Sequence, residues 1–167
     1  TLYNLRTMDA LVQGLQKRAY TDSLCQCLNR TCYELRGREI LESAPRPLAL
    51  IVADVDNLKA VNDRFGHKAG DEYLAVCVRL LKKVTRSGDT LFRIGGDEFA
   101  LFLPGTDEPG VERIRTALAS EFAALKLGHP ANLSIGYSIL GAGDTDFDRH
   151  FAVADAEMYR KKQGKKG

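Results

Sequence analysis

The chain has 167 residues and a formal net charge of +2, from 24 basic and 22 acidic side chains. This length is typical of one domain, and 44% hydrophobic with 28% charged residues excludes wholesale disorder. The near-neutral charge argues against broad nucleic-acid binding. No apolar run approaches the ~18 residues of a membrane span, and the polar N-terminal segment predicts no signal peptide. We therefore expect a cytoplasmic fragment without nucleic-acid or membrane contacts, whether or not its parent protein is membrane-tethered.

The four cysteines, at positions 25, 27, 32 and 77, are predicted to be reduced thiols. Cys25 and Cys27 are too close in sequence for an ordinary disulfide, and no second Cys or His pair has zinc-finger spacing. Free thiols are the usual state of cysteines in a cytosolic protein. A metal site or a redox switch is the alternative.

Residues 1–20 predict a helix that precedes the functional domain, which we place at residues 21–167. Its apolar residues recur at alternating steps of three and four, the a/d pattern of a heptad seam. The seam residues are Leu5, Met8, Val12, Leu15 and Ala19. Either the seam packs against its own domain, or it ends a longer signalling helix that pairs two chains.

The remaining pattern predicts alternating helices and strands. A continuous apolar run predicts a buried central strand over 48–55. A Gly-Gly pair between two apolar runs predicts a hairpin whose tight turn needs positive φ. We expect further strands over 90–94, 98–103 and 132–139. Helices are predicted from about residue 30, over 58–65 and 71–84, and within 111–125 and 147–158. Gly66 and Gly70 predict a break between the helices over 58–65 and 71–84. This order predicts an α+β fold with a mostly antiparallel sheet flanked by helices.

Acidic side chains occur where apolar surroundings make them costly. Asp54 follows the most apolar run, and Asp97 and Glu98 lie at the hairpin tip, where Gly95 and Gly96 let a ligand approach the backbone. If central strands bring these ends together, the clustered carboxylates need a cation or a proton between them. Oxygen ligands without histidine or thiolate suit Mg²⁺ or Mn²⁺, which support phosphoryl transfer. A glycine hairpin with two solvated acids is the alternative.

The hairpin tip has the sequence Arg93-Ile94-Gly95-Gly96-Asp97-Glu98-Phe99. This run resembles the signature of the GGDEF-domain diguanylate cyclases. Other matching runs are Asp54 to Asp63 with Gly66-His67 and Gly70-Asp71, Asp22-Ser23-Leu24, Leu28-Asn29-Arg30, Leu133-Ser134-Ile135-Gly136, and Ala154-Asp155 with Tyr159. The resemblance covers about residues 21–166. It implies the palm-like sheet of nucleotide cyclases and the condensation of two GTP molecules into the bacterial second messenger cyclic di-GMP, with release of two pyrophosphates.

The resemblance also implies metal and catalytic roles. Asp54, the carbonyl of Val55 and Asp97 would hold two Mg²⁺ (or Mn²⁺) ions per GTP. Glu98 would act as a further ligand or activate the 3′-hydroxyl that attacks the α-phosphate.

The substrate-binding residues that the resemblance implies are Asn57, Leu58, Lys59, Asn62, His67, Asp71, Gly95, Gly96, Lys161 and Lys162. The Asp71 carboxylate, with Asn62, would read guanine, because it accepts from N1–H and N2–H₂ groups that adenine does not present together. Main-chain N–H groups at a helix start would hold phosphate, and Lys161 or Lys162 would reach the β- and γ-phosphates. His67 either packs structurally at a helix break or contacts the ligand.

Arg86-Ser87-Gly88-Asp89 resembles the RxxD product-inhibition site of the family. Arg86 and Asp89 would bind cyclic di-GMP there, because a guanidinium can fork onto phosphate or a guanine edge. Arg113 or Arg115 would complete the site. An Arg–Asp turn pair on the surface is the alternative.

One GTP-bound domain cannot close the product ring, so the resemblance implies a homodimer controlled by an upstream sensory region of the parent chain. The alternative is a catalytically silent module that binds GTP or cyclic di-GMP and signals by contact.

Two segments depart from the family. Cys25-Gln26-Cys27 stands where Thr-Gly-Leu is usual, which we expect to affect stability or linker coupling. The stretch after Tyr159 is one residue shorter, with Lys where Arg is common.

Overall fold

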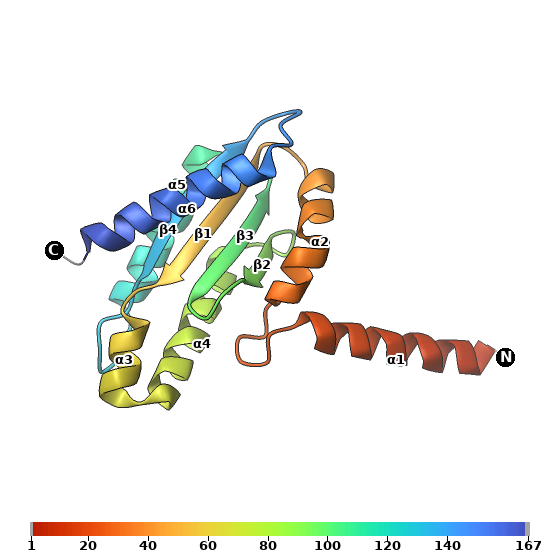
Figure 1. The fold of residues 1–167 in the computed structure, drawn as a ribbon, viewed down its shortest axis with the longest axis horizontal. Coiled ribbons are helices and arrows are strands. Elements are labelled where there is room, and N and C mark those ends of the chain that lie inside the picture. Colours follow the sequence, from red (N-terminus) through yellow and green to blue (C-terminus); the bar gives the residue numbers. More distant parts are fainter. Residues whose placement is uncertain (1, 166–167) are drawn as a thin grey trace.

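The computed structural model describes residues 2–165, which fold into one four-stranded antiparallel sheet with helices on both faces (Figure 1). The strand order is β2-β3-β1-β4. The strands are β1 (Leu48–Val55), β2 (Thr90–Arg93), β3 (Glu98–Pro104) and β4 (Leu133–Leu140). The helices are α1 (Leu2–Tyr20), α2 (Arg30–Ser43), α3 (Leu58–Phe65), α4 (His67–Val84), α5 (Glu108–Ala123) and α6 (Phe147–Gly164). This architecture confirms the predicted α+β class.

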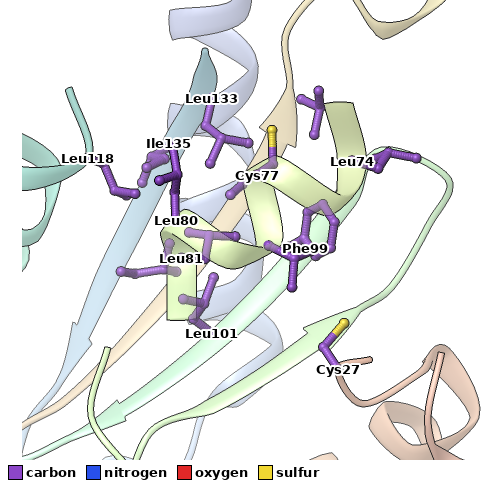
Figure 2. Close-up of a cluster of buried hydrophobic side chains, with 14 of the residues drawn as sticks. Cys27, Leu74, Cys77, Leu80, Leu81, Phe99, Leu101, Leu118, Leu133 and Ile135 are labelled. Carbon is purple, nitrogen blue, oxygen red and sulfur yellow. The ribbon is translucent and has the colours of Figure 1, made fainter. Parts of the chain in front are cut away.

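Strand β1 is central, and all of its residues are buried. Alternate side chains of a strand point to opposite faces, so β1 contributes to two cores. Ala49, Ile51 and Ala53 face α4 and α5, whereas Leu48 and Leu50 face α2 and α6. Figure 2 shows the first core, in which leucines of α4 lie over residues of β3 and β4. Burial on both faces explains why this strand reads as a continuous apolar run.

Helix α6 packs so closely on β4 that only glycine fits at the crossing. A Cβ atom on Gly136 would lie 1.9 Å from the Ala154 carbonyl oxygen and 2.4 Å from the Met158 nitrogen. Ala154 and Met158 are buried, one helical turn apart, on the face that meets the sheet. The helix continues to Gly164, well beyond the predicted core positions, so the basic segment from Arg160 to Lys165 is ordered by α6 and its cap rather than frayed. Lys166, the last lysine of the chain, lies outside the described residues.

Two predictions about glycines are wrong. The break between α3 and α4 falls at Gly66 alone, with φ of 89°, and α4 begins at His67, so Gly70 lies inside the helix. A Cβ atom there would meet Asn62 Oδ1 at 1.8 Å, so Gly70 makes room for that side chain. Neither hairpin glycine has positive φ. Gly95 instead accommodates the Glu98 side chain, whose Oε2 would lie 2.9 Å from a Cβ atom.

Helix α1 projects away from the sheet (Figure 1). Met8, Leu11, Val12 and Leu15 are 60%, 59%, 44% and 57% exposed. The interpretation in which the seam packs on its own domain is therefore wrong, and pairing of two chains stays a prediction. Within the part of the chain that the structure describes, no helix is long and apolar enough to cross a membrane.

Candidate functional site

The end of β1 and the tip of the β2–β3 hairpin meet, as the sequence predicts. Asp54 lies opposite Glu98 of β3 and opposite Ser134 of β4 in the strand register. The Val55 N–H donates to the Asp97 carbonyl at 2.9 Å, which extends the pairing beyond the ladder. Carboxylates from two distant segments are thus held at one edge of the sheet.

Lys162 of α6 reaches both carboxylates. Its Nζ donates a hydrogen bond to Asp54 Oδ1 and lies 3.8 Å from Asp97 Oδ2. Lys162 stands one turn beyond Met158 and two beyond Ala154, on the helix face that packs against the sheet. The close approach at Gly136 therefore delivers the ammonium group to the acidic cluster.

Burial controls the charge of Asp54, which is only 5% exposed. Desolvation raises the pKa of Asp54 to about 6, and the neighbouring Asp97 adds to the rise, while the hydrogen bond from Lys162 opposes it. Burial opposes the charge of Lys162, but the hydrogen bond to Asp54 and the negative charges of Asp54, Asp97 and Asp56 together outweigh it and raise the pKa of Lys162. The cluster therefore favours a positive charge between its carboxylates.

The donor set at this edge consists of oxygen atoms. No group of three His, Cys, Asp or Glu side chains among residues 2–165 is placed to hold a metal ion by itself. Mg²⁺ typically binds through one or two carboxylates and completes its shell with substrate phosphates and water. Asp54 and Asp97, with the Val55 carbonyl at the same edge, fit an ion that binds together with a phosphate ligand.

A pocket of about 320 Å³ lies beside the carboxylates. It is lined by Val55, Asn57, Leu58, Lys59, Ala60, Asp63, Asp97 and Lys162, six of which the sequence analysis assigns to the site. The pocket includes the start of α3, where Asn57 adopts a left-handed conformation with φ of 59°. The first N–H groups of a helix have no intrahelical partner and attract anions. The pocket therefore combines an anion-binding backbone with carboxylates suited to a cation.

The proposed guanine readers, Asn62 and Asp71, do not line this pocket. The Asn62 side chain lies against Gly70, in the angle between α3 and α4, and the exposed Asp71 follows Gly70 directly. His67 is exposed at the first position of α4, so the interpretation of a packed structural histidine is wrong.

Lys161 points elsewhere than Lys162. Its Nζ donates to the Ile135 carbonyl at 3.1 Å and pairs with Glu157. Glu157 in turn accepts from the Tyr137 N–H at 2.8 Å. Both side chains thus satisfy backbone groups of β4, and of the two lysines only Lys162 lines the pocket.

The sequence analysis assigns no role to Asp56, which the structure buries beside the site. Its carboxylate accepts hydrogen bonds from Ser134 Oγ at 2.6 Å and Lys165 Nζ at 2.7 Å. The buried Tyr73 hydroxyl lies 3.1 Å from the Asp56 carbonyl and accepts from the Asn132 N–H at 2.7 Å. In the sequence, Asp56 could have been recognised as a site residue from its position two residues after Asp54, at the end of an apolar strand.

Arg93 connects the hairpin tip to the segment after α1. Its Nη2 donates to the Gly96 carbonyl at 2.7 Å, and its Nη1 lies 3.1 Å from Asp22 Oδ2. Burial opposes ionisation of Asp22, but hydrogen bonds from the Cys25 N–H and from Arg93 lower its pKa. Asp22 is therefore an ionised anchor for the hairpin.

Arg86 and Asp89 lie at a second pocket, of about 500 Å³. The Asp89 carboxylate accepts from the Arg86 N–H at 2.7 Å, and Arg86 Nη2 donates to Thr106 Oγ1 at 2.9 Å. The turn pair that the sequence analysis gives as an alternative is thus present, and it lines a cavity. Arg113 lines the same pocket, whereas Arg115 pairs with Glu112 and lines a different one.

Known proteins resemble this chain over most of its length. The family model described as diguanylate cyclase, GGDEF domain, matches residues 19–167. Diguanylate cyclase DgcP of Pseudomonas aeruginosa is 34% identical over 164 residues, and the probable diguanylate cyclase DgcE of Escherichia coli is 32% identical over 165 residues. These matches cover 91% and 94% of this chain but only 24% and 15% of the two relatives.

A solved structure that concerns the interaction of a microbial GGDEF domain with cyclic di-GMP is similar in fold. It superposes with a TM-score of 0.76 and 33% sequence identity, covering 90% of this chain and 94% of that one. The chain therefore belongs to the GGDEF-domain family of diguanylate cyclases.

Proposed function

We propose that this chain is the catalytic domain of a diguanylate cyclase, which condenses two GTP molecules into cyclic di-GMP and releases two pyrophosphates. The observation that carries the proposal is the convergence of Asp54, Asp97 and Lys162 beside the start of α3. Such a site can bind a triphosphate through backbone N–H groups, an ammonium group and carboxylate-bound cations at once. The names of the relatives agree with this chemistry.

Asp54, Asp97 and the Val55 carbonyl would hold two Mg²⁺ or Mn²⁺ ions per GTP. When bound, the ions neutralise phosphate charge and make the attacking hydroxyl more acidic. The chain's own residues position the phosphates: the N–H groups of Asn57 and Leu58, with Lys59, hold them at the helix start. Lys162, already 3.8 Å from Asp97, lies where it can turn from the carboxylates to the β- and γ-phosphates.

Selectivity for guanine would come from Asn62 and Asp71, because a carboxylate accepts from both donor groups of the guanine edge. Asp71 is exposed on α4 and free to face a base, and His67 lies four residues before it on the same helix. Glu98, opposite Asp54 in the register, would serve as a further ligand or activate the 3′-hydroxyl.

Ring closure requires two such domains facing each other, so that each 3′-hydroxyl attacks the α-phosphate of the other GTP. The exposed seam of α1 supports residues 1–20 as the element that pairs two chains below an upstream sensory region. Residues 21–167 would then be the catalytic domain. Cyclic di-GMP would inhibit the domain by binding at Arg86, Asp89 and Arg113, which line one pocket.

Incubation with GTP and Mg²⁺, followed by identification of the product, tests this function. Cyclic di-GMP and pyrophosphate in a ratio of one to two support it. Binding of GTP without turnover, with the fold intact, would instead identify a silent module. ATP supplied together with GTP should yield no mixed cyclic dinucleotide, because adenine does not match the acceptors of Asp71.

A further inference from the structure

The turn between α1 and α2 places two thiols side by side. Cys25 and Cys27 are both buried in the same core cluster, on either side of Gln26, and each thiol shifts the pKa of the other. Gln26 between them is left-handed, with φ of 54°. Residues two apart in an extended chain are roughly 7 Å apart at Cα, the upper limit for a disulfide. The bend at Gln26 shortens this separation of the Cα atoms. The two cysteines can therefore form a disulfide, although they are only two residues apart in the sequence.

We propose that Cys25 and Cys27 form a dithiol modification site, which a hydroperoxide closes reversibly to an intramolecular disulfide. Cys77 lies on α4 in the same core cluster as Cys25 and Cys27, but far from them in the sequence, and Cys32 packs in the other core.

The surroundings give the two thiols different roles. The hydrogen bond from Cys25 lowers the pKa of the Cys27 thiol, with help from the positive charges of Lys82 and Arg93 and against burial and Asp22. The same hydrogen bond and burial raise the pKa of Cys25. A thiolate is the nucleophilic form of cysteine. Cys27 is therefore the attacking thiol, and Cys25 the resolving one.

Access favours the same assignment. Cys27 lines a pocket of about 530 Å³ together with Gln26, Lys82 and Thr85. Lys82 Nζ donates to the Gln26 carbonyl at 2.8 Å, which fixes the ammonium group beside the turn. A small oxidant can reach Cys27 through this pocket, whereas Cys25 does not line it.

The chemistry balances with the peroxide as the only co-reactant. The Cys27 thiolate attacks one peroxide oxygen, the O–O bond breaks, and the leaving hydroxide takes a proton to become water. The product is a sulfenic acid on Cys27. The Cys25 thiol then attacks that sulfur, the S–O bond breaks, and the Cys25 proton leaves with the hydroxide as a second water. Two thiols are oxidised, hydrogen peroxide is reduced to two waters, and a dithiol reductant reverses the reaction.

The turn that carries the thiols is the one that anchors the hairpin. Asp22 Oδ1 accepts from the Cys25 N–H at 2.8 Å, and the Asp22 N–H donates to the Cys27 carbonyl at 2.8 Å. The same Asp22 carboxylate holds Arg93, which holds the Gly96 carbonyl. Drawing the two sulfurs together therefore acts on a backbone that positions the signature hairpin.

Thiol counting on the folded wild-type chain tests the proposal. After hydrogen peroxide treatment and alkylation in denaturant, the number of free thiols should fall from four to two. Intact mass should fall by two hydrogens before alkylation, peptide mapping should place the bond within residues 21–30, and dithiothreitol should restore all four thiols. Unchanged thiol counts, equal loss at Cys32 and Cys77, or disulfides between chains would overturn it.

Matched variants separate the two roles. Cys25→Ser should leave a sulfenic acid on Cys27 that dimedone traps, whereas Cys27→Ser should react with neither peroxide nor dimedone at that turn. Cys32 is as buried as the other two cysteines, and the Cys32→Ser chain should still lose two free thiols on peroxide treatment. Dimedone labelling of Cys25 in the Cys27→Ser chain would contradict the assignment of Cys27 as the attacking thiol.

Oxidation should also change the rate of GTP turnover in the wild type but not in the Cys25→Ser/Cys27→Ser chain. This second measurement rests on the proposed function, whereas thiol counting does not. A chain that forms the disulfide but never turns over GTP would therefore refute the cyclase alone.

Discussion

Lys162 donates a hydrogen bond to Asp54 at the end of the central strand, although 108 positions separate the two residues in the sequence. The ammonium group supplies the positive charge that a buried carboxylate beside Asp97 requires. A divalent ion would supply the same charge more strongly. With an ion bound, as we propose, Lys162 would be free to bind phosphate.

Asp97→Ala should abolish cyclase activity while the fold is retained. The Asp97 side chain is 40% exposed, so its removal leaves no cavity, but it would remove a proposed ligand to the cation. A fall in turnover of about 100-fold or more is expected, measured as product formed per enzyme with thermal unfolding as the check. Asp63→Ala is the matched control, because Asp63 lines the same pocket without a proposed role. An active Asp97→Ala chain would contradict the assignment.

The raised pKa of Asp54 predicts a stability difference that depends on pH. The folded chain retains the Asp54 proton up to about pH 6, whereas the unfolded chain loses it near about pH 4. Ionisation therefore opposes folding: the contribution of Asp54 is fully present below about pH 4 and is lost as pH rises through about 6. Relative to Asp54→Asn, the wild type should lose up to ~3 kcal/mol of unfolding free energy between about pH 4 and about pH 7. Urea unfolding of both chains without metal, repeated across this pH range, measures the difference. If the unfolding free energies of the two chains change with pH in parallel, the prediction is wrong.

The sequence could predict the acidic edge because the features that define it are local. Strand β1 reads as a buried strand since both faces are covered, and Asp54 and Asp97 stand at the ends of apolar runs. The choice between Lys161 and Lys162 could not be predicted, because it depends on how α6 crosses β4. That crossing is set by Gly136, which in sequence is one more small residue in a strand.

The role of Gly70 could not be predicted for the same reason. Gly70 reads as a helix break, since glycine is a poor helix former. Its function is steric and involves Asn62, a residue on another helix. The partners of Asp56 could not be predicted either, because Ser134 and Lys165 lie on distant elements. Contacts of this kind follow from tertiary packing, which periodicity does not encode.

The α1 seam predicts that activity depends on pairing of two chains. Leu15→Glu should lower turnover and remove its rise with enzyme concentration, because a charge in a heptad seam opposes helix pairing. Thermal unfolding of the domain should not change, since Leu15 is 57% exposed. Leu35→Glu is the control, because Leu35 is 67% exposed on α2, away from the seam. Equal turnover per enzyme at all concentrations in the wild type would count against pairing.

Arg86→Ala should relieve inhibition by cyclic di-GMP. The guanidinium lines the pocket shared with Asp89 and Arg113, and its removal takes away a charged donor to phosphate or guanine. The product concentration for half-maximal inhibition should rise at least about tenfold, equivalent to ~1.4 kcal/mol of binding free energy. Arg115→Ala, on the same helix as Arg113 but outside this pocket, should leave inhibition unchanged. Product titration during turnover distinguishes the two variants, and unchanged inhibition in Arg86→Ala would remove the regulatory role.

Asp56 should act as a positioning residue for the turn that carries Asp54 and the start of α3. Asp56→Asn keeps the shape of the side chain but leaves Lys165 without its carboxylate partner, which should cost about 1–3 kcal/mol of stability. If the contact only stabilises the fold, kcat and KM for GTP should stay unchanged below the unfolding temperature. A positioning role predicts that KM for GTP rises, because the N–H groups that hold phosphate begin one residue after Asp56. Lys165→Met tests the same contact from its other end and should raise KM in the same direction. A rise in KM for neither variant would confine Asp56 to structural support.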